Sequence, residues 1–144
     1  MTRRPSRRRS RGAGADVDEL QTVVVCRGGD CGNRTKHPGF DHLGQLRRVR
    51  GEVDTTQARV VSSGCLDACE HSNVVVVVPG SAGRAHGAAP VWLGGVLDDA
   101  CTGDVVGWVN AGGPAVADEP VLVDLHTFHP TRLNRHELEE ELGS

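Results

Sequence analysis

Four of the five cysteines in this chain form two close pairs, and they are the residues best able to do chemistry. Cys26 and Cys31 are separated by four residues, Cys65 and Cys69 by three, and thirty-three residues lie between the pairs. Thiolates bind soft metals, and four of them complete the ligand shell of a [2Fe–2S] cluster, with two for each iron. The spacing therefore indicates a metal centre that uses all four of these cysteines.

Glycines accompany both cysteine pairs. Gly28, Gly29 and Gly32 lie in or beside the first pair, and Gly64 directly precedes Cys65. Glycine allows backbone N–H groups to turn toward a sulfur, and such hydrogen bonds help to set the reduction potential of a cluster. Acidic and basic side chains occur near both pairs, so the sequence leaves the sign of the local electric field open.

The composition indicates one small domain with a thin core. The chain has 144 residues, 38% of them hydrophobic, with 19 glycines, two tryptophans and two phenylalanines. Metal binding would then contribute to folding. No apolar run reaches the roughly 20 residues of a membrane-spanning helix, and the N-terminus does not resemble a secretory signal. We therefore expect a cytoplasmic protein, in which structural disulfides are rare.

Charge is distributed unevenly along the chain. The net charge is −3, yet residues 1–15 contain six arginines and no acidic residue, which leaves ten basic residues against 19 acidic ones in the remainder. An acidic body is a poor partner for nucleic acid and a suitable docking surface for a basic protein. We interpret residues 1–19 as a disordered basic leader; the alternative is an arm that binds nucleic acid or an anionic membrane.

Strand patterns place each cysteine pair just after the end of a strand. Strands are predicted over residues 21–25, 58–62, 74–78 and 91–93, which are rich in valine and are bounded by turn residues. Cys26 follows the first of these strands, and Cys65 follows the second. Open α/β sheets usually bind their ligands at this edge.

Two helices are predicted between and after the strands. The first opens at residues 37–39 and runs to about Arg48, with proline in its first turn and with Phe40, Leu43 and Leu46 facing inward. The second runs from Asp98, a suitable N-cap, to Ala111. Four residues share its buried face: Cys101, Val105, Trp108 and Val109. Cys101 is therefore interpreted as a small core residue and not as a ligand.

The order of these elements predicts an α/β fold of the thioredoxin-like type. The first two strands, joined through a helix, form a parallel crossover, and the last two form an antiparallel hairpin with residues 80–89 as its loop. The result is a four-stranded mixed sheet with flanking helices, over residues 20–113. Residues 114–144 form a C-terminal extension, in which residues 121–125 would add an edge strand. Asn134 would cap a short acidic helix through Leu142.

The segments VVVCRGGDCG and SSGCLDACE resemble those of the thioredoxin-like [2Fe–2S] ferredoxins, which are related to the small iron–sulfur subunit of NADH dehydrogenase. The likeness covers residues 20–112. It implies that Cys26 and Cys31 bind one iron and that Cys65 and Cys69 bind the other. It also implies a one-electron carrier, often a homodimer, that serves a flavin, molybdenum or iron–sulfur oxidoreductase and is not itself an enzyme. The basic leader in place of a helical domain favours a separate ferredoxin over a respiratory subunit.

Three alternatives use the same residues differently. A zinc site of four cysteines would make the chain a zinc-stabilised interaction module, although zinc ribbons usually place their ligands on hairpins. A thiol redox enzyme would require a C-x-x-C motif at a helix start, which this sequence does not contain. A Rieske-type or mixed cysteine–histidine site is the third alternative, since His37 and His71 lie near the cysteine loops. Four cysteines already supply every ligand position, and His126 and His129 lie in the extension, so we expect all seven histidines to be structural or exposed.

Overall fold

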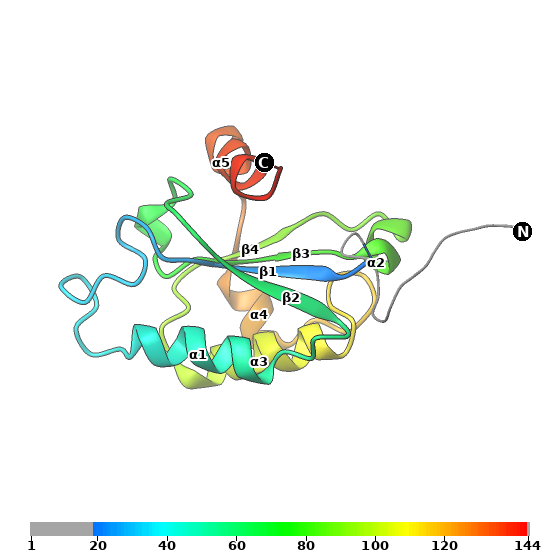
Figure 1. The fold of residues 1–144 in the computed structure, drawn as a ribbon, viewed down its shortest axis with the longest axis horizontal. Coiled ribbons are helices and arrows are strands. Elements are labelled where there is room, and N and C mark those ends of the chain that lie inside the picture. Colours follow the sequence, from blue (N-terminus) through cyan, green and yellow to red (C-terminus); the bar gives the residue numbers. More distant parts are fainter. Residues whose placement is uncertain (1–18, 144) are drawn as a thin grey trace, which may run out of the picture.

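The structure is a computed structural model that describes residues 19–143, and it contains a five-stranded mixed sheet with helices (Figure 1). The strands are β1 (Gln21–Cys26), β2 (Ala58–Ser63), β3 (Val75–Val78), β4 (Val91–Leu93) and β5 (Thr127–Phe128). The α-helices are α1 (His42–Glu52), α2 (Ser81–Ala85), α3 (Asp99–Asn110), α4 (Val121–His126) and α5 (Arg132–Gly143), and a 3₁₀ turn spans Cys69–His71. Residues 1–18, most of the expected leader, lie outside the described residues.

The strand order is β2-β1-β3-β4-β5. β1 runs parallel to β2, with Val23 opposite Val60, and antiparallel to β3, with Val24 opposite Val76. β4 pairs antiparallel with β3 and with β5. The parallel crossover through α1 and the antiparallel β3–β4 pair are those predicted from the sequence. The fifth strand was not part of the predicted four-stranded sheet.

Helices cover both faces of the sheet, so the central strands are buried on both sides (Figure 1). On the face covered by α1, α3 and α4, Val23 and Val25 pack in a core with Val105 and Val109. On the face covered by α5, a second core contains Val24, Cys26, Cys31, Leu66, Ala68, Val74, Val76, Trp92 and Leu138. The cysteines of the first pair therefore belong to the core that α5 closes.

α3 matches its prediction closely. Asp98 is its N-cap and accepts a hydrogen bond of 2.7 Å from the Cys101 N–H. The face predicted to be buried is buried, and Cys101 is completely inaccessible to solvent. The helix is followed by Gly112 and Gly113 at φ 128° and 73°, a backbone region that favours glycine.

The start and the buried face of α1 differ from the prediction. The helix begins at His42, since the Asp41 side chain caps it by accepting a 2.8 Å hydrogen bond from the Gly44 N–H. Leu43, expected to face inward, is 57% exposed, whereas His42, Gln45 and Val49 are buried. Leu46 packs against the first core as predicted and Phe40 precedes the helix, but Leu43 does not face inward, because polar partners from other elements hold His42 and Gln45 there.

The connection between β3 and β4 and the start of the extension also differ from their predictions. Residues 80–89, predicted as a hairpin loop, contain the short helix α2. Residues 121–125, predicted as an edge strand, belong to α4, which follows Pro120 and buries Val123. The edge strand is instead β5, where Phe128 pairs with Trp92. Burial of one valine against the first core outweighs the β-propensity of this short segment.

The cap of α5 is a reciprocal pair. Asn134 donates its backbone N–H to Thr131 Oγ at 3.0 Å, and its side-chain oxygen accepts the Thr131 N–H at 2.9 Å. The helix therefore starts three residues earlier than predicted, with Thr131 as its cap and Asn134 as the capping partner. Among the described residues, none of the helices is long and apolar enough to cross a membrane.

Candidate metal centre

The structure brings the four predicted cysteine ligands to one end of the sheet. Cys26 is the last residue of β1, Cys31 lies in the following loop, Cys65 follows β2, and Cys69 begins the 3₁₀ turn before β3. The Cys65 and Cys69 sulfurs are 3.6 Å apart. Cys26 and Cys31 are close enough to shift each other's pKa, and the Cys26 sulfur lies 3.5 Å from the Gly64 carbonyl oxygen. All five cysteines are free thiols.

Gly28 and Gly29 bring the first cysteine loop against the second pair. Gly29 has φ 59°, and a Cβ placed on it would lie 2.6 Å from the Cys69 sulfur and 3.1 Å from the Cys65 sulfur. A Cβ on Gly28 would overlap the backbone nitrogen of Cys65. The backbone at both positions therefore approaches the second pair more closely than a side chain would permit.

The four cysteines form two pairs that differ in solvent exposure. Cys26 and Cys31 are buried, at 2% and 4% exposure, whereas Cys65 and Cys69 are half-buried. Among residues 19–143, no group of three or more His, Cys, Asp or Glu side chains is placed so that it could hold a metal ion. The first pair thus faces the core below α5, and the second pair faces outward.

Backbone N–H groups point at one sulfur of each pair. The Val74 N–H donates to the Cys31 sulfur, and the Asp67 N–H donates to the Cys65 sulfur, both at 3.3 Å. Such donors stabilise negative charge on sulfur. In the second pair, burial raises the pKa of Cys65, and the hydrogen bond from Asp67 opposes that rise.

The two buried sulfurs shift each other's pKa in opposite directions. The neighbouring Cys31 side chain lowers the pKa of Cys26 from 9.0 to about 6, against the opposing effect of burial. The Cys26 side chain, together with burial, raises the pKa of Cys31. Within this pair, Cys26 is therefore the sulfur favoured to lose its proton first, and the thiolate is the form that binds metal.

Arg27 holds the base of the first cysteine loop. Its guanidinium donates to the Gln45 side-chain oxygen at 2.7 Å and to the His42 carbonyl at 3.0 Å. Burial lowers the pKa of Arg27, and the nearby Cys31 and Cys26 side chains oppose this shift. This arginine thus ties the loop that carries the first pair to the inward face of α1.

Asn73 holds the end of the same loop. It is fully buried, its side-chain oxygen accepts the Gly32 N–H at 2.8 Å, and its amide nitrogen lies 2.8 Å from His42 Nδ1. No role was predicted from the sequence for Arg27, His42, Gln45 or Asn73, because polar residues carry no periodic signal that would mark them as buried.

The histidines near the cysteines have other partners. His37 Nε2 lies 3.0 Å from the Ser72 hydroxyl, and the His71 ring stacks on Phe128 with centroids 3.9 Å apart. In the extension, His126 Nδ1 lies 2.8 Å from the Gly94 carbonyl, and His129 is exposed. These contacts agree with the expectation that the four histidines are structural or exposed.

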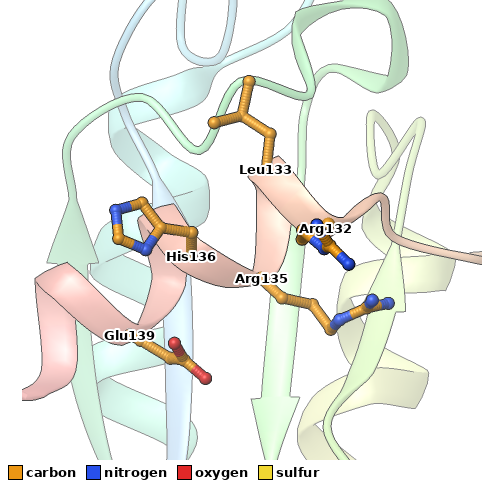
Figure 2. A pocket seen from close by; sticks show the side chains of 5 residues that line it. All are labelled: Arg132, Leu133, Arg135, His136 and Glu139. Atoms are coloured by element: carbon orange, nitrogen blue, oxygen red, sulfur yellow. The ribbon is translucent and has the colours of Figure 1, made fainter.

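A groove of about 400 Å³ lies on the outer side of α5, away from the second core. Figure 2 shows the five residues that line it, all from this helix: Arg132, Leu133, Arg135, His136 and Glu139. It contains no cysteine, and no described residue of the metal centre contributes to it. The groove is therefore separate from the candidate site.

The four cysteines thus lie as two pairs at the edge of the sheet where the parallel strands end, with backbone donors to two of the sulfurs and the first pair buried. Comparisons with known proteins found no matching family model, no matching curated protein and no matching solved structure.

Proposed function

We propose that this protein is a one-electron carrier that binds a [2Fe–2S] cluster through Cys26, Cys31, Cys65 and Cys69. The observation that carries the proposal is the arrangement of four free thiols as two pairs, with the backbone of Gly29 against both sulfurs of the second pair. Two pairs suit two bridged irons, each of which takes two protein thiolates. A single zinc ion would require four sulfurs around one point.

The surroundings of the sulfurs fit such a group. The Val74 and Asp67 N–H groups donate to cysteine sulfurs, as expected where thiolate charge has to be stabilised. Leu66, Ala68 and Leu138 pack with the first pair and exclude water from it. The proposal needs no further side-chain ligand, because the four cysteines complete the set.

When bound, a [2Fe–2S] cluster supplies one-electron transfer without a change of protein ligands. The chain's own residues would hold it rigidly, since Arg27 and Asn73 fix the first loop and the backbone of Gly28 packs on Cys65. The half-buried pair, Cys65 and Cys69, would be the side through which electrons pass to a partner, because electron transfer favours the shorter path from an exposed ligand.

The order β2-β1-β3-β4, with β1 and β2 parallel, supports the finer assignment to a thioredoxin-like fold and to the ferredoxins of that type. In this proposal the protein works in the cytoplasm, where its thiols stay reduced. Its acidic body docks on a flavin, molybdenum or iron–sulfur oxidoreductase, and it can form a homodimer as such ferredoxins do. Binding of nucleic acid forms no part of the proposal.

Anaerobic purification followed by metal analysis tests this function. We expect about two irons and two acid-labile sulfides per chain, with visible absorbance that bleaches on uptake of one electron. Electron paramagnetic resonance of the reduced protein would identify the cluster type. About one zinc per chain and no sulfide would refute the proposal in favour of the zinc-stabilised interaction module.

A further inference from the structure

Side chains of α5 form hydrogen bonds to the backbone on both sides of Cys65, in the loop of residues 64–69 that carries the second cysteine pair. The amide nitrogen of Asn134, a residue only 4% exposed, donates to the Leu66 carbonyl at 3.0 Å and to the Asp67 carbonyl at 2.9 Å. The Gly64 N–H donates to the Glu141 carboxylate at 3.1 Å. These three hydrogen bonds bracket Cys65, with one before it and two after it in the chain.

The backbone after Cys65 has a conformation that needs external support. Asp67 has φ 58°, in the left-handed region that residues with a Cβ adopt at a cost. In this conformation its N–H reaches the Cys65 sulfur. The bond from Asn134 to the Asp67 carbonyl holds the other side of the same residue. Without that bond, the N–H donor to sulfur would be free to turn away.

The face of α5 that carries Asn134 and Glu141 also makes an apolar contact with the cysteine loops, through Leu138. Asn134, Leu138 and Glu141 are spaced i, i+4 and i+7, which places them on one face of a helix. Leu138 is 5% exposed and packs in the core with Cys26, Cys31, Leu66 and Ala68. The outer side, seen in Figure 2, instead carries Leu133 at 54% exposure. One face of α5 therefore packs on the cysteine loops and forms hydrogen bonds with them.

We propose, building on the cluster function above, that Asn134 and Glu141 are positioning residues for the metal centre. α5 holds the 64–67 segment so that Cys65 stays in ligand position with its N–H donor in place, and it covers one side of the first pair. Loss of residues that orient metal ligands typically weakens metal binding by about 10- to 100-fold. The effect of Asn134 should exceed that of Glu141, because Asn134 is buried and makes two bonds to the loop.

The substitution Asn134→Asp removes both donors to the loop and places a carboxylate against the two carbonyl oxygens that they served. Aspartate retains an oxygen that can accept the Thr131 N–H, so the helix cap is kept, but its carboxylate cannot donate to the Leu66 and Asp67 carbonyls. Glu141→Ala removes the acceptor for the Gly64 N–H, and Glu141→Gln restores an acceptor without the charge. Glu139→Ala is the matched control, since Glu139 is exposed on the same helix and lines the outer groove.

Two measurements on the full chain decide the matter. Hydrogen exchange of residues 64–69 in the protein as purified reports on the loop, and iron release to a chelator reports on the centre. Asn134→Asp should speed both, with iron release about tenfold faster. Glu141→Ala should have a smaller effect that Glu141→Gln reverses, and Glu139→Ala should match the native chain.

The proposal is overturned if Asn134→Asp and Glu141→Ala both leave loop exchange and iron release at native values. If Asn134→Asp fails to fold, the comparison of Glu141→Ala with Glu141→Gln and Glu139→Ala decides alone. A native chain that purifies without iron would refute the cluster function itself. Loop exchange in the same variants would then still show whether α5 holds Cys65, so the two failures are distinguishable.

Discussion

Replacement of Gly29 with alanine tests whether the first cysteine loop lies against the second cysteine pair. The new Cβ would be placed 2.6 Å from the Cys69 sulfur and 3.1 Å from the Cys65 sulfur. A carbon and a sulfur in van der Waals contact are about 3.5–4 Å apart, so the Cys69 sulfur would have to move by about 1 Å. Metal–ligand distances tolerate only about 0.2 Å, and we therefore expect loss of the cluster.

The energetic cost of this substitution has two parts. Alanine at φ 59° costs roughly 1–2 kcal/mol relative to glycine because of its left-handed backbone. Overpacking of a well-filled site adds about 1–3 kcal/mol. The first part lowers stability with or without metal, whereas the second acts on the sulfur positions and hence on cluster binding.

Gly87→Ala is the matched control for Gly29→Ala. Gly87 has φ 83°, and a Cβ placed on it has no neighbouring atom within 4 Å. Alanine at this position therefore has the energetic cost of a left-handed backbone but no steric clash. Iron and acid-labile sulfide per chain, visible absorbance and thermal unfolding should be measured for both variants. Both should lower the melting temperature, but only Gly29→Ala should lose the cluster; full cluster content in Gly29→Ala would refute the placement of Gly29 against the two sulfurs.

Three further predictions concern the cysteines and their supports. Cys31→Ser and Cys65→Ser should abolish the cluster and destabilise the fold, whereas Cys101→Ala, on the buried face of α3, should retain the native iron content and visible spectrum; loss of iron in Cys101→Ala would contradict the assignment. Asn73→Ala leaves the part-buried Gly32 N–H and the buried His42 Nδ1 without partners, so urea denaturation should show a loss of stability of about 1–3 kcal/mol. An unchanged stability would indicate that the network is not formed. Burial raises the pKa of Cys101 from 9.0 to about 11, so the unfolded chain releases this proton first and stability should fall as pH rises through that range; the fall should be shallower in Cys101→Ala, and equal slopes would argue against a buried neutral thiol.

The sequence was most informative where local pattern and tertiary environment agree. The strands of consecutive valines and the strand 91–93 were predicted within one residue, because β-branched runs between turn residues have few alternatives. α3 was predicted for the same reason, since its cap and its apolar face both favour one helix. The close approach of the two cysteine pairs also follows from the predicted topology, since β1 and β2 are parallel neighbours that end at the same edge.

Local signals were weaker where polar residues are buried. Leu43 was expected inside α1 and is exposed, because Gln45 and His42 are held inward by Arg27 and Asn73. Hydrogen-bond partners from distant parts of the chain make such burial possible, and no periodicity of hydrophobic residues reveals it. The C-terminal extension also contains a buried polar residue. The sequence indicated that Asn134 caps a helix, but it gave no sign of the two hydrogen bonds from Asn134 to the cysteine loop.

The sequence alone thus predicted the strands and the edge of the sheet at which the cysteines lie, and it supplied the candidate ligand set, because residue type and spacing suffice for these. Only the tertiary structure decided which pair is buried, how closely Gly29 approaches the second pair, and that α5 closes the second core over the first pair. These features depend on contacts between segments far apart in the chain. Their energies come from packing and from long-range hydrogen bonds, which local sequence does not encode.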